Sequence, residues 1–307
     1  TKNWGGAFGG DDFAERIAVA GSAVYVAGRE QYGAGSNRWV ILKYDTAGNL
    51  LWTRNYAGGA ALFDTLYGAA VDGGGNVIVN GDTELGGGNY DWMIRKYDTA
   101  GTLLWFKTYD GPTGQDDISW SVATDSLDNV IVAGRERYSA GGYRWVTRKY
   151  DSGGTLLWSR TQASPAGAAD EAKGVAVTVG DQLLVCGYET RSDLGTAVDW
   201  VVRRYDAAGT LHWSVTYNGP TNGTDYPSDI SGAPDGSFVV VGTYAASGTG
   251  NDWMVRKYTV SAGLAAAAAA VPAVVTVGQS SSITLTVTNS GCVDTTNLTP
   301  ALAIGPG

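Results

Sequence analysis

The stretch RWVILKYDTAGNLLW, residues 38–52, decides the fold because it returns four more times along the chain. Close copies are DWMIRKYDTAGTLLW (91–105), RWVTRKYDSGGTLLW (144–158) and DWVVRRYDAAGTLHW (199–213), and DWMVRKYTV (252–260) begins a fifth. The first tryptophans of successive copies are 53 residues apart, and once 55. A period of this length is typical of repeat folds in which each unit buries its apolar face against its neighbours.

Each repeat predicts four short strands. In the first repeat they are residues 15–20, 23–30, 38–45 and 50–56, joined by turns rich in glycine, aspartate and asparagine. The turn DTAGN places Gly48 where a short hairpin needs a positive φ. Both faces of the third strand are largely apolar, so each small sheet needs cover on both sides. Radial stacking of four-stranded antiparallel sheets gives that cover and predicts an all-β propeller.

The two ends of the repeat region predict five blades and a way to close the ring. Trp4 and Phe8 match the fourth strand of a repeat, whereas the fifth repeat dissolves into SAGLAAAAAA before it reaches that strand. We therefore expect residues 2–8 to supply the fourth strand of the last blade, beside the segment of Trp253. The tryptophans expected to pack the blades are Trp4, Trp39, Trp52, Trp92, Trp105, Trp145, Trp158, Trp200, Trp213 and Trp253.

The repeats also resemble a known bacterial family. The pattern [IV]-x-K-Y, then D-x-x-G-x-L-x-W, together with GNVIVNG (75–81) and DNVIVAG (128–134), resembles SBBP-type β-propeller repeats. The resemblance covers about residues 1–260 and implies a module of a large secreted or surface protein. We therefore expect a location outside the cell.

The chain changes character after residue 260. Residues 261–273 are predicted to be an alanine-rich linker, and residues 274–307 are similar to the opening strands of bacterial immunoglobulin-like surface repeats. Two or three strands are present, whereas a sandwich needs about seven. This segment is therefore expected to pair with another copy or an adjacent domain, which can propagate into a filament. The residues expected to make that contact are Val275, Val277, Ile283, Leu285 and Val287.

The composition of the chain limits the classes of partner that it can bind. The net charge of −9 argues against a phosphate-backbone partner, so we expect no nucleic acid. The longest apolar run, residues 264–275, is too short and too broken by proline to insert in a membrane. One histidine, His212, and two cysteines without metal-binding spacing, Cys186 and Cys292, leave few catalytic sets. We expect no enzyme and no cofactor, with calcium as an open alternative.

One acidic position recurs before the first strand of every repeat. If that strand is innermost, five carboxylates ring one mouth of the central channel. One interpretation is a cation site or a glycosidase pair. The other, which we favour, is that each carboxylate caps its loop through backbone N–H groups, because five identical carboxylates offer no division into acid and base. The five residues are Asp12, Asp64, Asp117, Asp170 and Asp225.

Several other side chains that recur, or that stand outside the repeat, can be interpreted as structural or as functional. Tyr32, Tyr138 and Tyr143 are candidates for a shallow carbohydrate platform, although solvated loop tips give the same pattern. Trp120, outside the repeat register, is expected to pack in the core or line the channel. The recurring lysines of the third strands are expected to be ion-pair partners within or between blades.

Three functions fit these features. The one we favour is an extracellular structural module that assembles into a surface layer or filament through its C-terminal segment. The alternatives are a lectin-like carbohydrate-binding propeller and a five-bladed glycosidase. Fold alone does not choose among them.

Overall fold

The computed structural model describes residues 4–6, 8–58, 63–84, 89–139, 142–165, 169–195, 197–248, 250–258, 264–271 and 282–289. The chain divides into two units, Thr1–Lys257 and Tyr258–Gly307. Apart from the short 3-10 turn η1 (Ser192–Leu194), the regular elements of the described residues are strands. Within these residues, none of the helical structure reaches the length and apolarity needed to cross a membrane.

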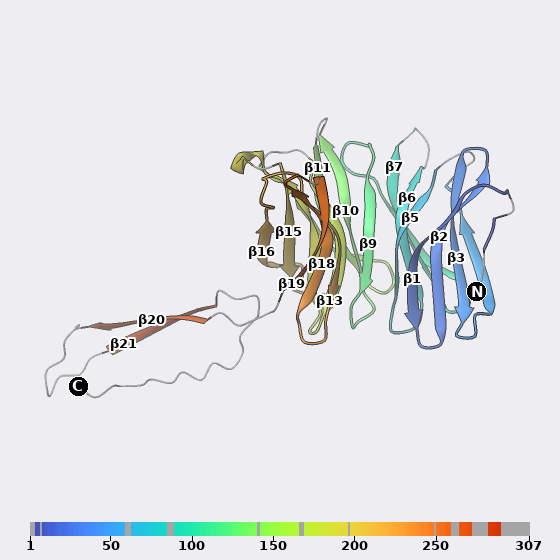
Figure 1. Cartoon of the computed structure of the whole chain (residues 1–307). Coiled ribbons are helices and arrows are strands. Elements are labelled where there is room, and N and C mark those ends of the chain that lie inside the picture. The colour runs from blue at the N-terminus through green and yellow to red at the C-terminus, as the bar shows by residue number, and fades with distance from the viewer. Residues whose placement is uncertain are drawn as a thin grey trace. The chain divides into compact units, whose positions relative to one another are not determined.

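The first unit is a series of five antiparallel sheets in which strands lie in sequence order (Figure 1). The first sheet is β1 (Asp12–Ala20), β2 (Ala23–Gly33), β3 (Ser36–Asp45) and β4 (Leu50–Tyr56). The second is β5 (Thr65–Val71), β6 (Val77–Glu84), β7 (Tyr90–Tyr97) and β8 (Leu103–Tyr109). The third is β9 (Ile118–Thr124), β10 (Val130–Ser139), β11 (Gly142–Tyr150) and β12 (Leu156–Gln162). The fourth is β13 (Glu171–Thr178), β14 (Gln182–Thr190), β15 (Val198–Tyr205) and β16 (Leu211–Tyr217), and the fifth is β17 (Tyr226–Gly232), β18 (Phe238–Ala246) and β19 (Gly250–Tyr258).

The predicted all-β repeat architecture is confirmed, with small differences in strand length. The first repeat has the four predicted strands, and β1, β2 and β3 are each longer than predicted by two or three residues at one end. Gly48 has φ +81°, as the DTAGN turn requires, and Asp45 Oδ1 accepts a hydrogen bond from the N–H of Asn49 at 2.8 Å.

The first strand of each sheet packs against the first strand of the next. β1 contacts β5, β5 contacts β9, β9 contacts β13, and β13 contacts β17. The hydrophobic core lies between adjacent sheets, because one cluster joins Trp39 and Ile41 of β3 to Leu66 and Val79 of the second sheet. Similar clusters join the second sheet to the third and the third to the fourth.

The predicted closure of the ring is not confirmed. The fifth sheet has three strands, and the described residues of the amino end, 4–6 and 8, form no strand beside β19. Trp4 Nε1 donates to Glu30 Oε2 in the first sheet at 3.3 Å, and Trp253 is 79% exposed. Five sheets of four, four, four, four and three strands are what the structure supports.

The second unit contains an antiparallel pair, β20 (Leu264–Val271) and β21 (Ser282–Asn289). Strand β20 lies within the predicted linker 261–273 and contains its alanine run. The run can form a strand because backbone pairing with β21 satisfies its N–H and C=O groups whatever the side chains. Ile283, Leu285 and Val287 pair with Ala270, Ala268 and Ala266. Val275 and Val277 lie outside the described residues, and an immunoglobulin-like domain is not confirmed.

Candidate functional site at the contacts between sheets

The first tryptophan of each repeat lies at the centre of the contact between one sheet and the next. Trp39, Trp92, Trp145 and Trp200 are each at most 1% exposed. Each indole lies over a glycine in the second strand of the following sheet, where an added Cβ would come within 2.6–2.9 Å of ring atom Cζ2. The added Cβ would also lie 2.0–2.1 Å from a backbone oxygen of the first strand of the same sheet, so this position requires glycine with or without the ring. The glycines are Gly81, Gly134, Gly187 and Gly242.

Polar contacts and neighbouring aromatic rings hold most of these indoles in place. Three of the indole N–H groups donate across the contact to the carbonyl oxygen that follows the glycine. These bonds run from Trp92 to Arg135 at 3.0 Å, from Trp145 to Tyr188 at 2.8 Å and from Trp200 to Thr243 at 2.9 Å. In the first, second and fourth sheets a tyrosine at the end of the fourth strand packs against the ring, with centroids 5.5–5.9 Å apart. The third sheet has Gln162 at that place, and Arg203 Cζ lies 4.4 Å from the Trp145 ring centroid.

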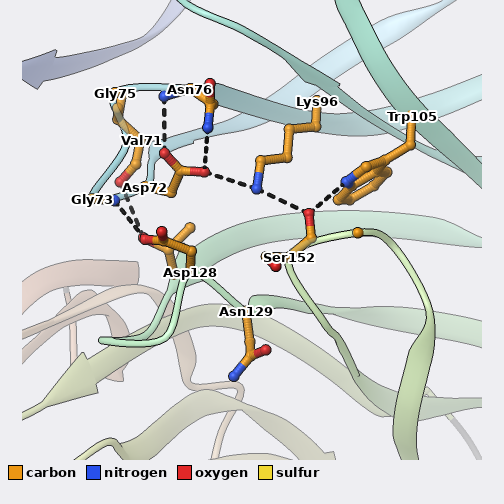
Figure 2. A network of polar contacts seen from close by, with 12 residues as sticks. Val71, Asp72, Gly73, Gly75, Asn76, Lys96, Trp105, Asp128, Asn129 and Ser152 are labelled. Atoms are coloured by element: carbon orange, nitrogen blue, oxygen red, sulfur yellow. Dashed lines mark hydrogen bonds and ion pairs between the residues drawn. The ribbon is translucent and has the colours of Figure 1, made fainter.

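A second contact joins each third strand to a turn of the following sheet (Figure 2). Lys96 Nζ lies 2.7 Å from Asp72 Oδ2 in its own sheet and donates to Ser152 O of the third sheet at 3.2 Å. Trp105 Nε1 donates to the same oxygen at 3.0 Å. Burial raises the pKa of Asp72, but hydrogen bonds from Lys96 and Asn76 outweigh it, so that the pKa lies below its ordinary value.

The same arrangement recurs one sheet further along. Lys149 Nζ lies 2.7 Å from Asp125 Oδ2 and donates to Ala207 O at 3.1 Å, and Trp158 Nε1 donates to that oxygen at 3.1 Å. The predicted role as ion-pair partners is confirmed for Lys96 and Lys149. In the first sheet, Lys43 Nζ donates to Thr99 O of the second sheet at 2.7 Å.

The five recurring aspartates each hold the loop that enters a sheet. Each accepts backbone N–H groups from a residue six positions earlier and from a residue at the end of the second strand. The bonds come from Gly6 and Gln31 to Asp12, Gly58 and Glu84 to Asp64, Gly111 and Arg137 to Asp117, Ser164 and Thr190 to Asp170, and Gly219 and Ala245 to Asp225. Both oxygens of every carboxylate are used, which is the arrangement that the capping interpretation predicts.

Burial raises the pKa of Asp117 to about 7 despite these bonds. Among the described residues, no three of the five aspartates come together. One group of three acids, Asp91, Asp110 and Asp117, has ligand atoms within 4.8 Å of one another, and burial followed by the charge of Asp110 raises the pKa of Asp91 to about 6.

The three tyrosines predicted as a carbohydrate platform each lie against an arginine of their own sheet. Arg38 Cζ is 5.3 Å from the ring centroid of Tyr32, and Arg144 Cζ is 5.3 Å from that of Tyr138. Arg135 Cζ lies 4.0 Å from the ring centroid of Tyr143. A guanidinium group thus lies against one face of each ring, and the shared carbohydrate platform stays a prediction.

One face of the first sheet lines a hollow of about 480 Å³. It carries residues equivalent to those with which the other sheets contact the sheet before them. We call it the acceptor face and define it by Val26, Gly28, Val40, Leu42 and Thr46, all of which line the hollow. Gly28 stands at the repeat position of Gly81, the glycine that lies under Trp39. Thr46 stands at the position of Thr99, whose carbonyl oxygen receives Lys43.

The comparisons with known proteins support the fold. No protein-family model and no curated protein matches the sequence. The similar solved structures are β-propeller folds. A protein of unknown function from Dyadobacter fermentans has a TM-score of 0.51 and 12% identity, with 80% of this chain and 79% of that chain covered.

Two further structures cover different shares of their own chains. Puromycin hydrolase gives a TM-score of 0.50 and 12% identity over 75% of this chain and 35% of that chain. The propeller domain of the Trilobed protease from Pyrococcus furiosus, described as having an open velcro topology, gives 0.48 and 9% over 80% and 69%. At 9–12% identity these likenesses concern the fold alone.

Proposed function

We propose that this chain is a non-enzymatic structural module of a surface protein, built as a five-bladed propeller that closes when the fifth sheet docks on the acceptor face. One observation carries the proposal: Trp253 is 79% exposed, while its four repeat equivalents are buried over a glycine of the following sheet. Gly28 offers the same backbone position at the other end of the series. Burying a large apolar side chain of this kind contributes roughly 1.5–3 kcal/mol.

A difference in side chains supports the amino end as the closing strand. At three of the four internal contacts an arginine three positions after the tryptophan lies over the tyrosine of the preceding sheet, with Arg95 Cζ 4.2 Å from the Tyr56 ring and Arg148 Cζ 3.8 Å from the Tyr109 ring. The first sheet has Leu42 at the arginine position, and the amino end has Phe8 at the tyrosine position. An apolar pair therefore replaces the cation and ring at this one contact. Trp4 lines the hollow beside the acceptor face.

We assign to the hairpin β20–β21 the role of linking this chain to another copy or to an adjacent domain. Its two strands pair with each other, and a two-stranded hairpin is only marginally stable in water by itself. An unpaired strand edge is a template for a strand from another chain. In this proposal the ring is rigid, and the hairpin adds it to another copy or to an adjacent domain of a surface protein.

Cysteine crosslinking tests the closure. In a Cys292→Ser background, Lys257→Cys and Thr46→Cys are combined and treated with a short bifunctional thiol reagent. Cys186 can stay, because it is buried and burial raises the pKa of its thiol, which keeps it unreactive. The matched control is Lys43→Cys with Thr99→Cys, a pair that spans an internal contact and whose removal leaves no buried acid unpaired.

We expect the Lys257/Thr46 pair to crosslink within one chain as efficiently as the control pair, at any protein concentration. Crosslinked dimers that increase with concentration would mean that a second copy occupies the acceptor face and would overturn the closed ring. No crosslink, in a protein whose control pair reacts, would overturn docking at this face altogether.

A further inference from the structure

Every sheet of the first unit has a β-bulge at the same place in its first strand. The register of pairing shifts between Ala14 and Arg16 and at the four equivalent places. In each case the residue left between the paired ones stands three positions after the recurring aspartate. A bulge leaves its extra residue unpaired and re-aims the side chain, which is why bulges are frequent beside active sites. The bulged residues are Glu15, Tyr67, Trp120, Lys173 and Ser228.

The bulge occurs at the same position in all five repeats, but each repeat has a different residue there. The aspartate before it recurs five times, and the glycine under each indole recurs at every internal contact. Positions that hold the sheets together are thus nearly constant. One acid, two aromatic residues, one base and one hydroxyl at a shared position are not what a packing role requires. This diversity at a fixed place on neighbouring strands is what a binding surface requires.

The bulged residues of the second, third and fourth sheets contact one another. The rings of Tyr67 and Trp120 have centroids 4.6 Å apart, and Lys173 Nζ lies 3.4 Å from the ring centroid of Trp120. Glu171 binds both Lys173, at 2.9 Å, and Arg135. We call Tyr67, Trp120, Arg135, Glu171 and Lys173 the inner cluster.

The inner cluster has more hydrogen-bond donors and positive charge than its own residues use. Trp120 Nε1 and Arg135 Nε are buried and have no acceptor among the described residues. Buried N–H groups without an acceptor cost free energy, so an acceptor from a ligand would be bound favourably. Glu171 is one acid against the two cations Lys173 and Arg135. A second acid, Asp82, accepts a hydrogen bond from Tyr67 Oη at 3.3 Å, and burial raises its pKa to about 7, which favours its neutral form below that pH. A complementary ligand therefore brings acceptor oxygens and a negative charge.

The aromatic residues add a second requirement. Tyr67 and Trp120 supply large, amphipathic ring surfaces, which suit a ligand with an apolar face and polar edges. A sugar ring has such a face in its C–H groups. We propose that the inner cluster binds a saccharide that carries a carboxylate, with the carboxylate at Lys173 and Arg135 and the sugar ring against Tyr67 and Trp120.

This inference goes beyond the structural role proposed above and does not depend on closure. The inner cluster lies on β5, β9, β10 and β13, which belong to consecutive sheets whose contacts are present in the structure. A chain that failed the crosslinking test would still carry the site. A chain that closed into a ring could still fail to bind a saccharide.

Titration calorimetry of the full chain provides the test, with oligogalacturonates, alginate oligomers and hyaluronan oligomers as acidic probes. The methyl esters of the same oligomers are neutral matched probes. We expect at least one acidic probe to bind and its ester to bind at least about tenfold more weakly, because a charge-assisted contact is lost. Lys173→Met should weaken acid binding by at least about tenfold, whereas Lys173→Arg should retain it within about threefold, because the charge is kept.

Two variants control for folding and for general charge. Ser228→Ala changes the bulged residue of the fifth sheet, and Lys107→Met removes one positive charge from β8. Both should leave acid binding within about twofold of the parent, since neither residue belongs to the inner cluster. The inference is overturned if none of the acidic probes binds, if acids and esters bind equally, or if Lys107→Met weakens binding as much as Lys173→Met. Thermal melts confirm that each variant is folded.

Discussion

The internal sheets and the two end sheets carry the same repeat, yet the same side chains are buried in one place and exposed in the other. Trp200 is fully buried between the fourth and fifth sheets, whereas Trp253 is 79% exposed. On the first strands, Val122 and Val175 are buried, whereas Ile17 at the same repeat position is 67% exposed. The composition of the sheets is therefore not what decides burial.

The difference shows that each sheet obtains its core from the next sheet in the series. A single repeat cannot bury its apolar faces, so stability is expected to be a sum of contacts between neighbours. If the ring closes as proposed, the end sheets present the two halves of one contact: Trp253 with Lys257 at one end, and the acceptor face at the other. If those two surfaces meet, the end sheets are buried in the same way as the internal sheets.

The largest expected effect comes from truncating the tryptophans. Trp200→Ala should lower the free energy of unfolding by about 3–5 kcal/mol, because it leaves a cavity between two sheets. If the ring closes as proposed, Trp253→Ala should cost a similar amount. Urea unfolding of both variants measures this difference directly. A Trp253→Ala cost below about 0.5 kcal/mol, typical of an exposed site, would show that the fifth sheet stays unpacked in solution.

A somewhat smaller effect is expected from the lysines of the third strands. Lys96→Met should cost about 3 kcal/mol, because it leaves the buried carboxylate of Asp72 without its cation. The first sheet has Ala20 at the repeat position of Asp72. Lys43→Met therefore removes one hydrogen bond to a carbonyl oxygen and leaves no buried acid unpaired, so its cost should be about 1.5 kcal/mol.

A double variant sharpens this comparison. Asp72→Asn added to Lys96→Met removes the stranded charge and should recover part of the lost stability. Chemical denaturation of the single and double variants gives the coupling free energy. Equal costs for Lys96→Met and Lys43→Met would contradict the view that the ion pair, rather than the contact with the next sheet, distinguishes the internal lysines.

Much of the fold could be predicted from the sequence, because the repeat shows directly which positions are equivalent. Strand order, hairpin turns such as the one around Gly48, and the alternation of faces are local properties. The arrangement at the ends could not be predicted in the same way. In the proposed closure it depends on a contact between residues far apart in the chain, Trp253 and Gly28, and a repeat pattern does not show whether two such distant residues meet.

The candidate sites were predicted in part. The capping role of the recurring aspartates followed from their repetition, and the structure shows the backbone N–H groups that they accept. The glycines under the indoles were missed, although GNVIVNG and DNVIVAG both end on them. Of the inner cluster only Trp120 was singled out, as a core or channel-lining residue, because a bulge re-aims one residue of a strand and the sequence alone does not reveal a bulge. Variation at the third position after each aspartate was the available signal.

The smallest expected effect concerns a position that differs between an internal sheet and an end sheet. Asp82 of the second sheet is buried, and burial raises its pKa to about 7, although it accepts hydrogen bonds from Thr65 N and Tyr67 Oη. The first sheet has Arg29 at this position, partly exposed and 3.9 Å from Glu15. Only the second sheet therefore makes a pH-dependent contribution to the free energy of unfolding at this position.

The sign of this pH dependence follows from proton binding. Between about pH 4 and pH 7 the folded state holds a proton on Asp82 that the unfolded state has released, so stability falls as pH rises through this range and levels off above it. We expect the melting temperature to decline by about 2–4 °C for each kcal/mol lost. Asp82→Asn should flatten the decline without abolishing it, because burial also raises the pKa values of Asp64 and Asp117. A variant whose melting temperature declines as steeply as that of the parent would show that Asp82 is solvated, and that the interior of the second sheet is as open as the ends.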